Sequence, residues 1–260
     1  MNVIASIRTL IHYRWLLQEL IIKDLKIKYR RSVLGYLWSV LNPLMMMVIM
    51  TIVFSQMFRF DIPNYPVYVL SGHLLYNFYA EATSVGMHSI LWGAALMKKV
   101  YLPKYIFPLS RVLSSFTTML FSMAALIIVM VVTGSSFHIT AILLPELFLS
   151  LLIFSIGMSL ILSVMIVFFR DMEHFYGVFL TALCYLTPIF YPMSLLPEWV
   201  RELLVYNPLC SYLEFFRKIM LYGVWPSAGE HLMCAGFSLA ALLFGLYIFK
   251  KKQDKFILYI

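Results

Sequence analysis

The feature that most constrains this chain is a long uncharged apolar segment that directly follows a strongly basic one. Seven cationic residues precede Leu34, and no formally charged residue occurs from Leu37 to Phe58. As a helix rising about 1.5 Å per residue, these roughly 22 residues extend about 33 Å, enough to cross the hydrocarbon core of a bilayer. Because Lys and Arg accumulate on the side that is not translocated, the sequence predicts a cytoplasmic N-terminus.

The composition places the whole chain in a membrane. It is 62% hydrophobic and 12% charged, whereas soluble domains are about 45–50% apolar and about 25% charged. Six helical spans of about 20 residues each leave room only for connections within 260 residues. We therefore predict one all-α, polytopic membrane domain over 1–260, with a cytoplasmic amphipathic arm (1–34), a six-span core (35–249) and a cytoplasmic tail (250–260).

Hydropathy and breakers define the spans. We expect an amphipathic interface helix over 1–22, and the spans are predicted near 37–58, 66–90, 106–132, 142–169, 175–190 and 231–249. With this assignment sixteen of the twenty Lys and Arg residues fall on the cytoplasmic side. That excess supports a topology with both termini in the cytoplasm.

The second predicted span is the least apolar. Polar residues recur in it at intervals of three or four, which puts them on one face of a helix: His73, Asn77, Glu81, Ser84 and His88. A carboxyl group at membrane depth costs about 2.5–3.5 kcal/mol on insertion scales, so this face should meet protein or water. Helix packing and channel lining both remain open for it.

Two short cytoplasmic connections and one broken external segment complete the chain. We expect a short helix over 91–105 around the lysines near Pro103, and a tight loop over 170–174. Pro188 and Pro192 lie four residues apart, so both cannot belong to one regular helix. Two amphipathic pieces, 198–206 and 211–222, are too short and too charged to span and are divided by Asn207-Pro208.

Two blocks of sequence resemble a known family. The first consists of a basic segment, a Ser-x-Leu-Gly-x-x-Trp pattern and a proline one turn into the first span: Lys23, Asp24, Leu25, Lys26, Lys28, Tyr29, Ser32, Leu34, Gly35, Trp38 and Pro43. The second runs from the Phe-Phe-Arg-Asp loop through Thr-Pro-Ile-Phe-Tyr-Pro and Asn-Pro-Leu to Arg217 and Gly223. Both are similar to the permease subunits of ATP-binding cassette exporters for cell-surface polysaccharides, which serve O-antigen, capsule or teichoic acid export.

This resemblance implies partners and roles. It implies a homodimer in the bacterial cytoplasmic (inner) membrane, with two copies of an ATPase subunit that bind ATP and Mg, a lipid-linked glycan as cargo, and contact with membrane lipid. We expect ATPase coupling by Lys98, Lys99, Lys104, Arg170, Asp171 and Glu173, with the arm from Ile7 to Lys28 alongside. The expected translocation path includes Tyr76, Asn77, Glu81, Phe116, Tyr185, Phe190 and Tyr191. The expected outer gate includes Pro188, Pro192, Asn207, Pro208 and Arg217.

Motifs for covalent chemistry are missing from the sequence. It has no phosphate-binding loop of the G-x-x-x-x-G-K-[ST] type, no H-E-x-x-H and no G-x-S-x-G, so we expect a transporter subunit without a cofactor or metal of its own. Cys184, Cys210 and Cys234 are widely spaced and indicate neither a disulfide framework nor a metal site.

Other functional classes stay open on the sequence alone. The net charge of +8 is better explained by topology and anionic lipid than by nucleic acid. A membrane-embedded transferase would need an acid, base or metal cluster at the membrane surface, and only the loop at Arg170 is a candidate. An ATP-binding cassette exporter of drugs or small lipids would share the fold, and it is the main alternative.

Overall fold

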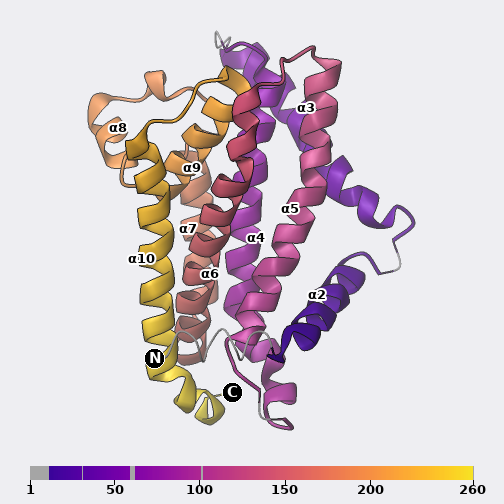
Figure 1. Ribbon diagram of the computed structural model, residues 1–260, viewed down its shortest axis with the longest axis vertical. Coiled ribbons are helices and arrows are strands. Elements are labelled where there is room, and N and C mark those ends of the chain that lie inside the picture. The colour runs from indigo at the N-terminus through magenta and orange to yellow at the C-terminus, as the bar shows by residue number, and fades with distance from the viewer. Residues whose placement is uncertain (1–11, 31, 59–61, 101, 260) are drawn as a thin grey trace.

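The computed structural model describes residues 12–30, 32–58, 62–100 and 102–259. Regular structure in these ranges is helical, and they contain no strand, which confirms the all-α prediction. The long helices run beside one another as a bundle, and α2 lies obliquely against one side of it (Figure 1).

The helices have the following bounds: α2 Arg14–Lys28, α3 Trp38–Phe58, α4 Tyr65–Met97, α5 Ile106–Val132, α6 Leu144–Phe168, α7 Met172–Leu186, α8 Glu198–Leu204, α9 Pro208–Arg217 and α10 Ala228–Lys252. Short 3-10 turns occupy Gly35–Leu37, Ile139–Leu143, Met193–Leu195 and Gln253–Leu258, and a π-helical turn occupies Lys218–Tyr222.

Four helical segments of the described chain are long and apolar enough to cross a membrane: Gly35–Phe54, Ile106–Val132, Ile139–Phe168 and Ala228–Leu258. They correspond to the first, third, fourth and sixth predicted spans. The helices at the second and fifth predicted spans, α4 and α7, fall outside this set for different reasons. α4 carries the polar residues noted above, and α7 has only 15 residues.

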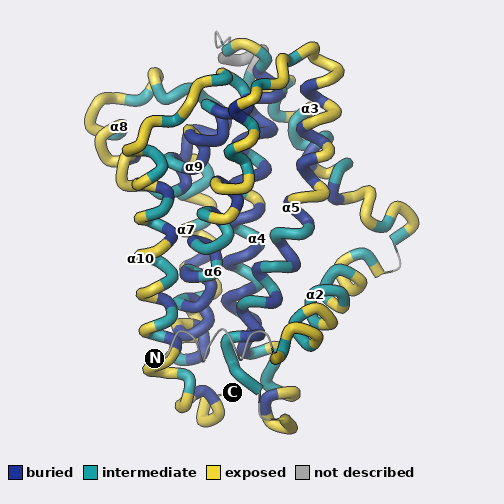
Figure 2. Tube along the Cα trace, in the orientation of Figure 1, coloured by how far each residue is buried: buried dark blue, intermediate teal, exposed yellow. Residues whose placement is uncertain are grey.

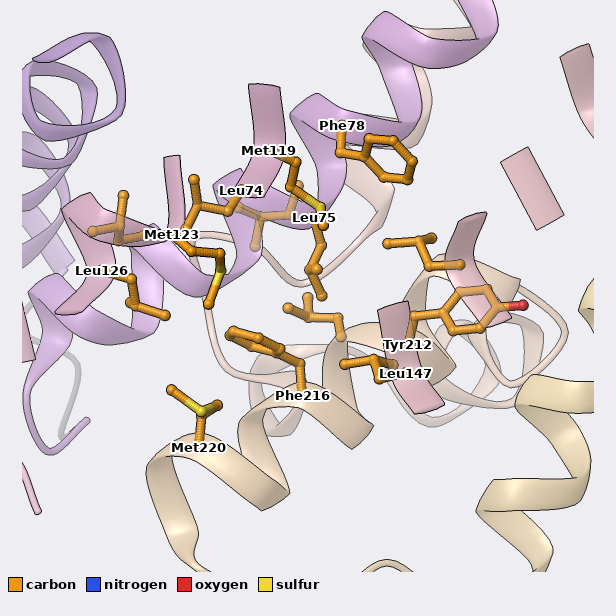
Figure 3. Packing of buried hydrophobic residues seen from close by; sticks show 14 of the residues in the cluster. Leu74, Leu75, Phe78, Met119, Met123, Leu126, Leu147, Tyr212, Phe216 and Met220 are labelled. Atoms are coloured by element: carbon orange, nitrogen blue, oxygen red, sulfur yellow. The ribbon is translucent and has the colours of Figure 1, made fainter. Parts of the chain in front are cut away.

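The core of the bundle is built around α4. Figure 2 shows its tube largely in the colour of buried residues, and α5, α6 and α9 all contact it. Figure 3 shows how apolar side chains from these elements meet: Leu74, Leu75 and Phe78 of α4, Met119, Met123 and Leu126 of α5, Leu147 of α6, and Tyr212 and Phe216 of α9. The helix that carries the polar residues from His73 to His88 is therefore largely enclosed by other helices, which is the environment that polar groups need inside a membrane protein.

Glycines allow the backbones of α6 and α10 to approach each other closely. A Cβ atom on Gly157 would come within 2.4 Å of the backbone of Ala241, and one on Gly245 within 2.5 Å of the Gly157 carbonyl oxygen. Small residues at such crossings let two helix backbones pack directly in a membrane, where water does not drive association. The close packing of α6 against α10 thus requires glycine, which has no side chain, at both Gly157 and Gly245.

The predicted short helix over 91–105 is wrong in its first half. Residues 91–97 continue α4 without interruption, because the first helix-breaking proline after Ile90 is Pro103. Gly93 does not break the helix, and its missing side chain makes room for the ring of Phe107, which a Cβ would meet at 2.6 Å. The connection to α5 is correspondingly shorter than predicted.

Other boundaries also shift. The arm helix runs to Lys28 rather than to residue 22, and the part of the predicted arm before residue 12 lies outside the described residues. The fifth helix ends at Leu186, before the predicted residue 190, because Thr187 turns to an extended conformation ahead of Pro188. The second external piece begins at Pro208 rather than residue 211, since Asn207 caps that helix by accepting a 3.1 Å hydrogen bond from the Leu209 N–H.

Candidate functional site

A glycine turn joins the basic arm to the first apolar helix. Gly35 has φ +50°, in the left-handed region that side chains disfavour, and its N–H donates to the Ser32 hydroxyl at 3.2 Å. The 3-10 turn Gly35–Leu37 then leads into α3 at Trp38. The Ser-x-Leu-Gly-x-x-Trp pattern therefore forms a turn of defined backbone geometry between the arm and α3.

Pro43 lies inside α3, and α5 compensates for the hydrogen bond that it removes. A proline has no N–H to donate to the carbonyl four residues earlier, which here is that of Ser39. That carbonyl instead accepts a 2.7 Å hydrogen bond from the Ser122 hydroxyl of α5. The proline thus creates a specific polar contact between two helices at membrane depth.

Two ion pairs attach α2 to the bundle. Asp24 is 2.5 Å from Arg111 of α5, and Lys28, one helical turn further on, is 2.7 Å from Glu81 of α4. The Ser115 hydroxyl also donates to Glu81 at 3.1 Å. Burial raises the pKa of the Asp24 carboxyl, while the charges of Arg111 and Lys23 act in the opposite direction.

A cavity of about 440 Å³ adjoins this contact, between α2, α3, α4 and α5. Its lining combines hydroxyl, amide and charged groups with aromatic rings: Lys28, Tyr29, Ser32, Trp38, Ser39, Asn42, Pro43, Leu74, Asn77, Phe78, Glu81, Ser115, Thr118, Met119 and Ser122. The predicted path residues Asn77 and Glu81 therefore share one cavity. Sequence reasoning missed the α5 side of it, although the recurrence of Ser and Thr along 110–122 was a visible signal.

The polar face of α4, which runs from His73 to His88, contacts several elements. Asn77 is hydrogen-bonded to His73 at 2.7 Å within the helix, whereas Glu81 contacts the arm. Further along, His88 stacks on Trp92 and lies 3.3 Å from the Glu173 carboxylate, at the start of α7.

The predicted path aromatics divide into packed and exposed rings. Phe116 is in contact with Phe78 and Phe148, and Phe190 is buried and stacks on Phe54 at 5.4 Å. Tyr76 donates a 2.6 Å hydrogen bond to the Leu180 carbonyl, which ties α4 to α7. The Tyr191 hydroxyl donates to the carbonyl of Tyr185, and the Tyr185 ring itself is exposed.

Arg217 holds the broken segment after α7. Its guanidinium donates to the Pro188 carbonyl at 2.7 Å, the Ile189 carbonyl at 3.0 Å and the Tyr68 hydroxyl at 2.8 Å. The predicted gate residues Pro188 and Arg217 therefore meet, and the arginine binds carbonyls in the segment where the prolines interrupt the helix.

The predicted coupling residues lie at the opposite end of the bundle. Lys98, Lys99, Asp171 and Glu173 are exposed there, at the junctions of α4 with α5 and of α6 with α7. Lys104 and Arg170 instead make contacts with the C-terminal segment.

Comparison with known proteins identifies the family. The family described as ABC-2 type transporter matches residues 16–221, which extend from α2 through the broken segment and α9 into the π-helical turn. This chain belongs to the ABC-2 type transporter family. Membership confirms the resemblance seen in the sequence, and it implies a multi-pass protein of the bacterial inner membrane whose family consists of transporter permease subunits.

Several relatives of this ABC-2 type transporter are named for the export or transport of polysaccharides. The O-antigen export system permease protein of Klebsiella pneumoniae is 31% identical over 90% of both chains. The protein of that name from Myxococcus xanthus is 30% identical over 97% of this chain and 98% of its own length. The polysialic acid transport protein KpsM of Escherichia coli is 23% identical over 91% of this chain and 93% of its own.

The ion pair between Asp24 and Arg111 generates a testable prediction. Asp24→Arg and Arg111→Asp should each destabilise the transporter by about 1–3 kcal/mol, because each leaves two like charges in a half-buried contact. The double variant Asp24→Arg/Arg111→Asp should recover most of the loss. Thermal unfolding of the detergent-solubilised protein provides the measurement.

Lys26→Glu is the matched control for that experiment. Lys26 is exposed on the same helix, and it belongs to none of the ion pairs among the described residues, so its charge reversal should leave the midpoint nearly unchanged. If the double variant were no more stable than the single ones, the pair would not be what holds α2 in place.

Proposed function

We propose that this chain is the transmembrane subunit of an ATP-driven exporter that moves a lipid-linked polysaccharide of the O-antigen, capsule or teichoic-acid type across the cytoplasmic membrane. The observation that carries the proposal is similarity at full length: relatives named for O-antigen export align with 90% or more of the chain. A relative named for polysialic acid transport aligns over a similar share. No comparison favours the alternative of a drug exporter.

The proposed topology has six membrane crossings with both termini in the cytoplasm. α4 supplies a crossing despite its polar residues, because it is enclosed by other helices. α7 is short, and the broken segment with α8 and α9 completes the fifth crossing on the external side. Irregular backbone at that depth is acceptable where it is buried in protein, which the carbonyl contacts of Arg217 support.

We propose that a separate ATPase subunit binds the cytoplasmic end of the bundle and supplies ATP, Mg and hydrolysis. The docking residues would be the exposed Lys98, Lys99, Asp171 and Glu173, with α2 alongside. Two permeases and two ATPases would form the complete exporter. The exposed apolar residues of α7, which include Phe175, Val178 and Leu186, support a second membrane partner such as another copy of this chain.

The glycan path is proposed to lie along that permease interface. Asn77, Glu81 and the cavity beside them would offer hydrogen bonds to sugar hydroxyls, and Tyr76 and Tyr185 would offer rings to the C–H faces of sugars. Phe116, Phe190 and Tyr191 belong to the same proposal, although Phe190 must be uncovered before it can contact cargo. The segment containing Pro188, Pro192, Asn207, Pro208 and Arg217 would act as the outer gate.

Deletion of the gene tests the proposed cargo. Surface polysaccharide should disappear while lipid-linked glycan accumulates inside the cell, and a plasmid copy of the gene should restore export. Unchanged surface glycan, combined with altered resistance to a small apolar drug, would contradict the proposal and favour the drug-exporter alternative.

Charge reversal tests the proposed docking surface. Lys98→Glu, Lys99→Glu and Asp171→Lys should each weaken co-purification of the ATPase or lower export, because complementary charges fix the orientation of a docked partner. Arg201→Glu, on the opposite end of the bundle, is the control and should bind the ATPase normally. Normal binding together with normal export in all three variants would exclude this surface.

A further inference from the structure

The C-terminal tail of this protein is packed against the bundle. After α10 ends at Lys252, residues Gln253–Leu258 form a 3-10 turn under the end of the bundle where α4, α6 and α10 finish (Figure 1). Phe256 in this turn is fully buried, while its neighbours Ile257 and Leu258 are 53% and 79% exposed. One side chain of the tail is thus inserted into the protein.

Phe256 occupies an apolar cluster made by several helices. The centre of its ring lies 5.4 Å from the ring centre of Phe249 of α10 and 6.3 Å from that of Phe168 of α6. The same cluster includes Met97, the last residue of α4, and Phe107 in the first turn of α5. The ammonium of Lys104 lies 5.8 Å from the centre of the Phe256 ring.

Two polar contacts join the tail to both cytoplasmic connections. The Lys104 ammonium, between α4 and α5, donates to the Gln253 carbonyl at 2.7 Å. The Arg170 guanidinium, between α6 and α7, donates to the Tyr259 carbonyl at 3.1 Å. Tyr259 also packs edge-on against Phe168 at 4.9 Å. One short segment therefore binds both connections, which are 66 positions apart in the sequence between Lys104 and Arg170.

The arrangement differs from that of an ordinary basic tail. Lys250, Lys251 and Lys252 are explained by topology alone, since cations gather on the cytoplasmic side. Topology does not explain a buried phenylalanine, because ordering a chain end costs conformational entropy that burial must offset. Both acceptors are backbone carbonyls, so the position of the turn, set by Phe256, determines whether Lys104 and Arg170 find partners.

We propose that Gln253–Tyr259 is a brace that positions the two cytoplasmic connections relative to each other, with Phe256 as its anchor. Through the brace, a displacement applied to one connection is transmitted to the other, so that α4, α5, α6 and α7 move together. The inference rests on the proposed docking of an ATPase at these connections. It assigns the tail a role in coupling rather than in ATPase binding.

Phe256→Ala is the decisive variant, and Leu258→Ala is its matched control on the same turn. Removing a buried phenyl ring shifts a docking equilibrium on the order of a hundredfold toward release, whereas trimming an exposed leucine has little effect. Spin labels at Val100, on the first connection, and at His174, in the first turn of α7 beside the second connection, are both exposed and report the distance between the two connections. The distance distribution should broaden in Phe256→Ala and stay unchanged in Leu258→Ala, and equal distributions in both would overturn the brace.

The functional readout is the amount of glycan exported per ATP hydrolysed by the full permease–ATPase complex. Phe256→Ala should keep ATPase co-purification and hydrolysis but lower export per ATP about tenfold. The reason is that a displacement applied by the ATPase to one connection would no longer be transmitted fully to the other. Unchanged export per ATP in Phe256→Ala would overturn the brace while leaving the exporter assignment intact. Failure of the wild-type protein to bind an ATPase or to export glycan would instead overturn the proposed function.

Discussion

The structure depends on how charged groups are paired inside a membrane protein. Glu81 lies near the middle of α4, where an unpaired carboxylate is costly, and its partner Lys28 comes from an arm that precedes the first apolar helix. Asp24 and Arg111 repeat the pairing one turn earlier on the same arm. The basic segment is therefore attached to the helix bundle by its own charged residues.

The same rule governs backbone groups. Pro43 removes a hydrogen bond from α3, and the freed carbonyl of Ser39 is bonded by Ser122. Pro188 interrupts the chain after α7, and the carbonyls there are bonded by Arg217. Each proline thus makes one helix depend on a side chain of another, which links distant parts of the sequence at specific points. Any motion of the broken segment must therefore break or replace the hydrogen bonds from Arg217 to these carbonyls.

Much of the helix pattern was predictable, because apolar runs and prolines are local signals. The sequence indicated that Pro188 and Pro192 break a helix, and α7 does end before them. The continuation of α4 to Met97 was not predicted, although the absence of a proline before Pro103 is a local signal for it. The fit of the Phe107 ring beside Gly93, in contrast, is a contact between two helices. The partner of Glu81 and the burial of Phe256 likewise depend on contacts between segments far apart in the chain. Hydropathy along one segment contains no information about such contacts.

The most direct test of the account is transport in inside-out membrane vesicles that contain this permease and its ATPase. The account predicts that ATP moves lipid-linked glycan from the outer face of the vesicle into its lumen, where a glycan-degrading enzyme added outside cannot reach it. Vesicles without the permease, or with ATP replaced by a non-hydrolysable analogue, should leave the glycan accessible. Protection of the glycan without this chain, or its absence when permease, ATPase and ATP are all present, would contradict the account.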